Sequence, residues 1–277
     1  MRLDLLNNLI NQKIILFDVI MKMVINMYYV GIDIGSTASK VVVLDDSKKE
    51  ILFKKVMPTG WSSVETSKTI KEWLESNGVN EDNSKVVATG YGRVSVPFAD
   101  KVVTEITCHA KGASFFNDTD MTIIDIGGQD TKAISYKNGM LEDFIMNDKC
   151  SAGTGKFLEV MANRLGVGLD EMFDLARTGK DVKISSMCTV FAETEIISLI
   201  GKGTPKEDIA CGVINSIINK VKTLVHRLPA TDYYFLTGGF SGNDYMTEHL
   251  SELLSATVET NENARFAGAI GAAVLAR

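Results

Sequence analysis

A nine-residue phrase occurs twice in this chain of 277 residues. Ile32–Lys40 aligns without a gap with Ile124–Lys132, and Asp33 falls against Asp125 at a constant offset of 92 (125 − 33). Each copy ends an apolar, strand-type run with an Asp, turns on Gly, and leaves through a hydroxyl residue and a Lys into a second apolar run. A single turn of this kind also makes an ordinary hairpin. Hairpin formation does not require Asp at the same place twice, so the repetition indicates a duplicated functional unit.

The chemistry of the repeated turn suits a polyphosphate. Each turn places a carboxylate at a strand end, beside glycines whose backbone N–H groups are free. Two such turns facing each other would hold phosphate oxygens with their N–H groups and Mg²⁺ with their carboxylates. We therefore expect Asp33 and Asp125 to be the catalytic, metal-facing carboxylates. The candidate phosphate-binding residues are Gly35, Ser36, Thr37, Lys40, Gly127, Gly128 and Gln129.

Two other glycine motifs do not fit known phosphate loops. Gly90–Arg93 lacks the third glycine of a dinucleotide-binding fingerprint. Gly153–Phe157 is like the end of a P-loop, but Cys150 replaces its first glycine, and Phe157 stands where a magnesium-binding hydroxyl is needed.

Composition narrows the class of partner. The chain carries a formal net charge of −6 and no long basic run, which argues against nucleic acid or an anionic membrane as the main partner. Its four cysteines are too sparse for a disulfide scaffold, so we expect a reduced, cytoplasmic setting.

The first 26 residues differ from the rest. Their apolar positions are interrupted by charged and amide side chains, which fits neither a signal peptide nor a spanning helix. Met27 directly precedes the first predicted strand. We expect residues 1–26 to be a dispensable extension; an amphipathic partner-binding helix is the alternative.

The order of predicted elements is also duplicated. In each half, three strands joined by hairpins are followed by helices and a further strand, which predicts a duplicated α/β fold with the ligand between two subdomains. The expected division is an extension at 1–26, a first subdomain at 27–112 joined by the terminal helix 264–277, and a second subdomain at 113–263. The predicted strands are 30–34, 40–44, 51–57, 85–89, 121–126, 131–136, 140–146 and 233–236; the predicted helices are 62–75, 155–165, 169–176, 191–200, 206–228, 244–254 and 264–276.

A third glycine-rich segment, Thr237–Asn243, follows a predicted strand and opens a helix. Gly238 and Gly239 would let the backbone approach a flat ring, although a plain strand-to-helix turn explains them as well. Together with the two Asp turns and the small residues Ala267–Ala273, this segment resembles the nucleotide-binding fold shared by actin, hexokinase and the heat-shock chaperone ATPases. The resemblance implies that the Asp turns are phosphate loops and that Gly238 and Gly239 lie by the adenosine.

Two cysteines stand just ahead of predicted helices, Cys150 and Cys188. A helix N-terminus favours a thiolate or an anionic cluster, and Thr154 and Thr189 are expected to cap these helices. The alternative interpretation is that Cys150 and Cys188 are buried apolar residues without a ligand. An iron–sulfur cubane needs four thiolates, so two per chain suffice only if two chains meet on a twofold axis, or if Cys108 and Cys211 complete the set. We expect these last two to be core residues, and His109 and His226 to be packing or surface residues.

The segments Asn147–Lys156 and Cys188–Glu195, combined with Asp125–Asp130, closely resemble the ATP-dependent activators of 2-hydroxyacyl-CoA dehydratases and the related ATPase subunits of benzoyl-CoA reductase. The resemblance implies a homodimer with one 4Fe–4S cluster, held by Cys150 and Cys188 of each chain. It further implies ATP or ADP with Mg²⁺, a ferredoxin or flavodoxin as donor, and a two-subunit dehydratase as acceptor. Gln129 is the candidate for orienting the attacking water.

Two rival functions share the same fold. A small-molecule kinase, such as a sugar kinase, would leave the two helix-leading cysteines unexplained. A regulatory ATP-binding protein would have no cluster. Iron content distinguishes both from an activator.

Overall fold

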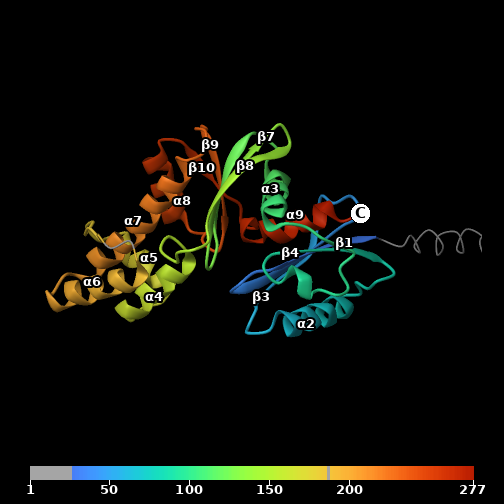
Figure 1. Ribbon diagram of the computed structural model, residues 1–277, viewed down its shortest axis with the longest axis horizontal. Helices are drawn as coiled ribbons and strands as arrows, with labels where there is room; N and C mark the ends of the chain where they lie inside the picture. The colour runs from blue at the N-terminus through green and yellow to red at the C-terminus, as the bar shows by residue number, and fades with distance from the viewer. Residues whose placement is uncertain (1–26, 186–187) are drawn as a thin grey trace, which may run out of the picture.

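The computed structural model describes residues 27–185 and 188–277, so the expectation for the first 26 residues lies outside the described part. The first lobe is built on a five-stranded sheet in the order β3-β2-β1-β4-β5 (Figure 1). The strands β1, β2 and β3 are antiparallel; β4 pairs in parallel with β1, and β5 pairs in parallel with β4. The bounds are β1 Tyr28–Ile34, β2 Ala38–Leu44, β3 Ile51–Pro58, β4 Ser84–Thr89 and β5 Lys101–Val102.

The second lobe repeats this sheet strand for strand, in the order β10-β9-β6-β7-β8. Again the first three strands along the chain are antiparallel, and the other two are parallel. The bounds are β6 Met121–Ile126, β7 Thr131–Lys137, β8 Met140–Asn147, β9 Tyr233–Gly238 and β10 Thr257–Glu259. The short strands β5 and β10 lie at equivalent sheet edges, and the sequence pattern missed both.

The register of the two hairpins is the same. Asp33 lies directly opposite Lys40 in the ladder of β1 and β2, and Asp125 lies directly opposite Lys132 in that of β6 and β7. The central strands are almost continuously apolar because helices cover the sheets. The edge strand β3 instead alternates half-buried and exposed residues, as expected for one covered face.

Helices cover both faces of the first sheet. Helix α2 (Ser63–Ser76) packs Ile70 and Leu74 against one face, and the Ser62 side chain caps it by accepting a hydrogen bond from the Glu65 N–H. The opposite face is covered by α9 (Ala267–Leu275), which contacts β1, β2 and β4. A 3₁₀ turn, η1 (Arg93–Ser95), follows β4, and a second, η2 (Ala264–Phe266), leads into α9.

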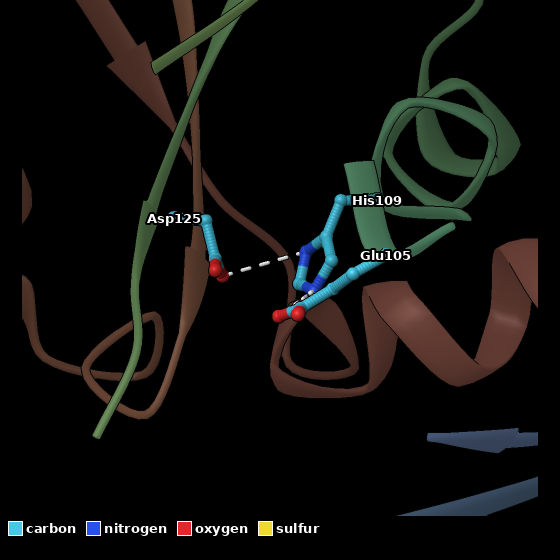
Figure 2. Close-up of side chains that lie close together, drawn as sticks. All are labelled: Glu105, His109 and Asp125. Atoms are coloured by element: carbon cyan, nitrogen blue, oxygen red, sulfur yellow. Dashed lines mark ion pairs between the residues drawn. The ribbon is translucent and has the colours of Figure 1, made fainter. Parts of the chain in front are cut away.

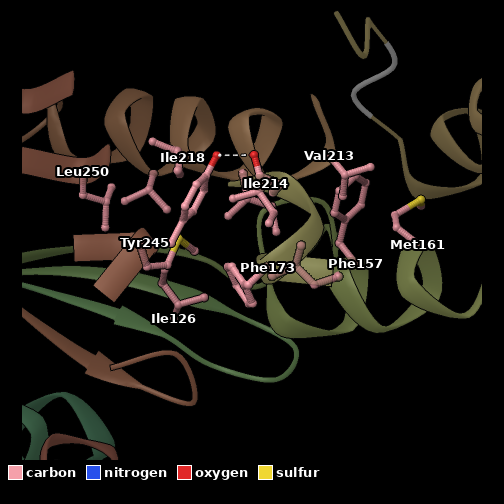
Figure 3. Packing of buried hydrophobic residues seen from close by; sticks show 14 of the residues in the cluster. Ile126, Phe157, Met161, Phe173, Val213, Ile214, Ile218, Tyr245 and Leu250 are labelled. Atoms are coloured by element: carbon pink, nitrogen blue, oxygen red, sulfur yellow. Dashed lines mark hydrogen bonds between the residues drawn. The ribbon is translucent and has the colours of Figure 1, made fainter. Parts of the chain in front are cut away.

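The largest apolar core lies in the second lobe, between its sheet and a layer of helices (Figure 3). Phe157, Phe173, Ile214 and Tyr245 come from four different helices and meet in this core. The 20-residue helix α7 crosses it and buries eleven of its residues. The bounds are α4 Gly155–Leu165, α5 Leu169–Ala176, α6 Thr189–Gly201, α7 Lys206–Val225 and α8 Asp244–Leu254.

Helices α3 (Glu105–Phe116) and α9 cross between the lobes, side by side (Figure 1). Although α3 follows the first sheet in the chain, Ala110 and Ala113 pack with Ile123 and Ile134 of the second sheet. The boundary expected between residues 112 and 113 therefore falls inside α3, a helix whose start was expected near Cys108 but whose extent was not predicted. Among the described residues, no helix combines the length and apolar character needed to span a membrane.

The two crossing helices touch backbone to backbone. A Cβ atom placed on Gly112 would lie 1.8 Å from the carbonyl oxygen of Ala267, and one on Gly271 would lie 1.8 Å from that of Cys108. Neither position has room for a side chain, because the neighbouring atom is backbone in both cases.

We expect Gly271→Ala to lower the free energy of unfolding by about 1–3 kcal/mol, the usual cost of overpacking a close contact. The matched control is Gly201→Ala in α6, where no heavy atom lies within 4 Å of the new Cβ. Urea denaturation followed by circular dichroism measures both. Equal midpoints for the two variants would contradict this account of the helix contact.

Candidate nucleotide site and cysteine loops

A cleft of about 270 Å³ lies between the two lobes, where both Asp turns meet. It brings together every residue predicted for the nucleotide except Gln129, whose side chain is exposed and does not line it. The predicted lining residues are Asp33, Gly35, Ser36, Thr37, Lys40, Asp125, Gly127, Gly128, Gly238 and Gly239. Further lining residues that the sequence analysis did not select include Tyr91, Glu105, His109, Asp130, Glu159, Phe240 and Arg265.

The two Asp residues are not equivalent. Asp33 is 3 % exposed, and its Oδ1 has no hydrogen-bond partner among the residues that the structure describes. Its other oxygen lies 3.6 Å from the Lys40 ammonium. Burial raises the pKa of Asp33, and Lys40 opposes that rise. Asp33 therefore keeps one buried carboxylate oxygen without a partner among the described residues.

Asp125 is fully partnered. The Thr237 hydroxyl donates to its Oδ1 over 2.8 Å, and the Lys132 ammonium donates to its Oδ2 over 3.2 Å. The His109 Nδ1 lies 3.4 Å from Oδ1. Burial would raise the pKa of Asp125, but His109, Lys132 and Thr237 together lower it below its ordinary value.

Two further titratable side chains, Glu105 and His109, lie close to Asp125 (Figure 2). Glu105 and His109, one turn apart on α3, face Asp125 on β6, with 3.8 Å between the Glu105 Oε1 and the His109 Nε2. The sequence analysis assigned His109 to packing and did not select Glu105. The helical i, i+4 spacing of a Glu and a His was the available signal, but the extent of α3 was not predicted.

A Thr-Gly pair also occurs twice beside the Asp turns. Thr89 pairs with Asp33 across β4 and β1, and Thr237 pairs with Asp125 across β9 and β6. The following Gly90 and Gly238 have φ of +83° and +90°. A Cβ on Gly90 would lie 2.4 Å from the Asp33 Oδ1, so no side chain fits at this position beside the carboxylate. The two Thr-Gly pairs stand 148 residues apart (237 − 89), whereas the Asp turns repeat at an offset of 92. Because the offsets differ, the second repetition was not recognised in the sequence.

Cys150 and Cys188 are free and exposed, and they lie on neighbouring loops. The Ser151 and Thr189 hydroxyls, each next to a cysteine in sequence, are 2.8 Å apart and share a hydrogen bond. Cys188 is the N-cap residue of α6. Thr189 is therefore the first helical residue, and its prediction as a cap is wrong.

The loop that carries Cys150 is placed differently relative to the helix that follows it. Thr154 is the N-cap residue of α4, as predicted, but its hydroxyl donates to the Ser151 carbonyl rather than capping an N–H. Cys150 stands four residues earlier, and the Asn147 side chain donates to its carbonyl oxygen over 3.0 Å. The expectation that both thiols sit directly at helix N-termini is met only by Cys188.

The other two cysteines are core residues, as predicted. Cys108 is completely buried, and burial raises the pKa of its thiol to about 12. Cys211 is 7 % exposed, and burial raises its pKa as well. A raised pKa disfavours the thiolate that a metal requires.

Comparison with known proteins decides the family. A model of the BadF/BadG/BcrA/BcrD ATPase family matches residues 30–276. This chain belongs to that family. It is 44% identical over 254 residues to the (R)-2-hydroxyglutaryl-CoA dehydratase activating ATPase of Acidaminococcus fermentans, covering 91% of this chain and 97% of that protein.

Solved structures of family members match closely. The crystal structure of the Acidaminococcus fermentans (R)-2-hydroxyglutaryl-CoA dehydratase component A has a TM-score of 0.85 at 43% identity, covering 90% of this chain and 97% of that one. The activator of the 2-hydroxyisocaproyl-CoA dehydratase from Clostridium difficile, with bound ADPNP, has a TM-score of 0.83 at 38% identity, covering 90% and 94%. A glucokinase of the ROK family from Streptomyces griseus shares only the fold, at 15% identity and a TM-score of 0.60 over 90% and 99%.

These findings confirm the predicted fold class and the predicted family. The duplicated two-subdomain α/β ATPase fold is that of the family, and similar proteins include an activating ATPase of (R)-2-hydroxyglutaryl-CoA dehydratase and an activator of lactoyl-CoA dehydratase.

The unequal partners of the two Asp residues predict unequal effects of substitution. Asp33→Asn should leave stability nearly unchanged and weaken magnesium-dependent ATP binding on the order of tenfold to a hundredfold, the loss of one charged contact. Asp125→Asn should in addition lower the free energy of unfolding by about 1–3 kcal/mol, because it weakens the bonding of a buried ammonium. Calorimetric ATP titration and urea denaturation measure the two effects. Equal stabilities of both variants would refute the asymmetry.

Proposed function

We propose that this chain is an ATP-dependent electron-transfer activator of a 2-hydroxyacyl-CoA dehydratase. Two copies would hold one 4Fe–4S cluster through Cys150 and Cys188 of each, and the cluster would supply one low-potential electron to the partner dehydratase. A reduced ferredoxin or flavodoxin would be the donor. The observation that carries the proposal is a pair of exposed thiols on loops hydrogen-bonded to each other and to a phosphate turn.

The two exposed cysteines fit half of a cluster. A cubane takes four thiolate ligands, and a twofold axis brings the same two from each copy. The surface beside Cys188 supports such a contact, because the first turn of α6 exposes Val190 and Phe191 by 65% and 67%. Ile197 and Ile200 continue this exposed apolar surface along the helix.

The cleft fits a nucleotide with Mg²⁺. The unpartnered Oδ1 of Asp33 offers a hard oxygen ligand, which Mg²⁺ prefers, commonly with several of its waters retained. Backbone N–H groups of the glycine turns and the Lys40 ammonium would bind phosphate oxygens. Gly238, Gly239 and Phe240 line the cleft where a base and ribose would lie. Asp125 would act as the second carboxylate of the clamp.

A hydrogen-bonded path joins the second phosphate turn to the loop of Cys150. The N–H of Gly155 donates to the Gly127 carbonyl over 2.9 Å, and the N–H of Lys156 donates to that of Gly128 over 2.8 Å. The Thr131 hydroxyl donates to the Gly153 carbonyl over 2.6 Å. A shift of this turn on loss of the γ-phosphate would therefore move α4 and its preceding loop.

The same path reaches the second cysteine through the bond between Ser151 and Thr189. Both thiols would then respond together to the nucleotide. This arrangement supports coupling between hydrolysis and the position of the cluster ligands, since the turn that binds phosphate and the loop that carries a thiol share backbone hydrogen bonds. A sugar kinase or a cluster-free regulatory protein would have no use for such a connection.

Cys150→Ser and Cys188→Ser should each abolish the cluster, because one substitution removes two of four ligands from a symmetric dimer. Cys108→Ala and Cys211→Ala are the controls and should retain about four irons per dimer. Iron analysis, electron paramagnetic resonance of the dithionite-reduced protein, and mass in solution measure the effects after anaerobic purification. A full cluster in either serine variant, or one cluster in each monomer, would refute the shared cluster.

A further inference from the structure

Glu105 is a carboxylate of the cleft without an assigned role. It is the first residue of α3, its side chain is 21% exposed, and it lines the cleft with both Asp residues. A helix N-terminus stabilises a negative charge at this position. Figure 2 shows that the side chains of Glu105 and His109 extend from the same helix toward the strand that carries Asp125.

The cation that pairs with Glu105 is the ammonium of Lys132 rather than a metal ion. The composition of Glu105, His109 and Asp125 would suit a metal ion, but the Lys132 ammonium already lies among these carboxylates. It is 2.9 Å from the Glu105 Oε1 and 3.2 Å from the Asp125 Oδ2, and its side chain is 1% exposed. The Asp130 Oδ1 is the third carboxylate partner, at 2.8 Å. Lys132 therefore fixes Glu105 relative to the second phosphate turn.

The other carboxylates near the turns are more buried or already paired, and the Gln129 amide lies outside the cleft lining. Both oxygens of Asp125 are already bonded, one to Thr237 and the other to Lys132. The side chains of Asp33 and Asp130 are only 4% and 12% exposed, against 21% for Glu105. Glu159 pairs with Lys156 on α4. Gln129, the residue selected from the sequence to orient the water, is exposed and outside the cleft lining.

We infer that Glu105 is the catalytic residue that orients the attacking water, and that Lys132 and His109 are positioning residues that hold its carboxylate. The inference rests on the ATPase activity within the proposed function and not on the cluster. Glu105 accepts a hydrogen bond from a water placed in line with the γ-phosphorus. The water oxygen forms the new bond to phosphorus, and the bond to the bridging oxygen breaks. ADP leaves with that electron pair, and the water's proton leaves with the phosphate product.

The test compares ATP hydrolysis and ATP affinity across four proteins: wild type, Glu105→Gln, Gln129→Ala and Glu65→Gln. Glu65 is the matched control, because it is an exposed carboxylate in the first turn of α2. We expect kcat of Glu105→Gln to fall on the order of a hundredfold, the typical effect of removing a group that handles the reacting water, with the Kd for ATP changed less than about threefold. Glu65→Gln should stay near wild type, and a loss of kcat in Gln129→Ala with none in Glu105→Gln would assign the water to the amide instead.

Two results would overturn the assignment. One is a kcat of Glu105→Gln within about threefold of wild type; the other is a loss of ATP affinity with kcat unchanged, which indicates a binding role. The assay needs neither cluster nor partner. A protein that hydrolyses ATP normally but binds no iron would refute the proposed electron transfer and leave this comparison intact.

The positioning role is tested by a double-mutant cycle. Lys132→Met should lower kcat, and combining it with Glu105→Gln should lower kcat no further, because both changes disable the same carboxylate. Additive losses would show that Lys132 acts independently of Glu105. His109→Gln provides the same cycle without removing the buried charge, so that a Lys132→Met protein that does not fold still leaves the coupling measurable.

Discussion

The buried ammonium of Lys132 is the interaction on which the organisation of the site depends. It pairs with Asp125 and Asp130 in the second Asp turn and with Glu105 on a helix that crosses between the lobes. The equivalent Lys40 in the first lobe is 22% exposed and lies 3.6 Å from Asp33. Both oxygens of Asp125 are thus bonded within the protein, whereas one oxygen of Asp33 has no partner among the described residues. The two hairpins share their register, and their different neighbours give the two Asp residues different surroundings.

The second turn is connected to more of the molecule than the first. Its carbonyl groups accept the first N–H groups of α4, and its Thr131 hydroxyl bonds the loop that follows Cys150. A rearrangement of this turn would displace the loop that follows Cys150, because hydrogen bonds join the two directly. The apolar contacts of α3 with α9 complete the arrangement by bringing the lobes together at backbone distance.

Much of the fold was predictable because the pattern is local. The hairpins at both Asp turns, and the helices Gly155–Leu165, Leu169–Ala176 and Asp244–Leu254, lie where the periodicity of the sequence places them. A helix start was expected near Cys108, but the extent of α3 was not predicted, because Cys108, His109 and Gly112 make it a poor amphipathic pattern. Its residues face a second helix on one side and charged groups on another. Without α3, neither Glu105 nor His109 could be connected to the cleft.

The sequence by itself determined the repeated Asp turns and the pair of cysteines, because each depends on residue type at short spacing. Only the tertiary structure decided which Asp keeps an unpartnered oxygen, which lysine is buried and which further carboxylate lines the cleft. Those properties come from contacts between segments up to 112 residues apart, as between Asp125 and Thr237. Burial then sets the strength of each charge interaction, because removing water strengthens the attraction between opposite charges and penalises any charge left unpaired.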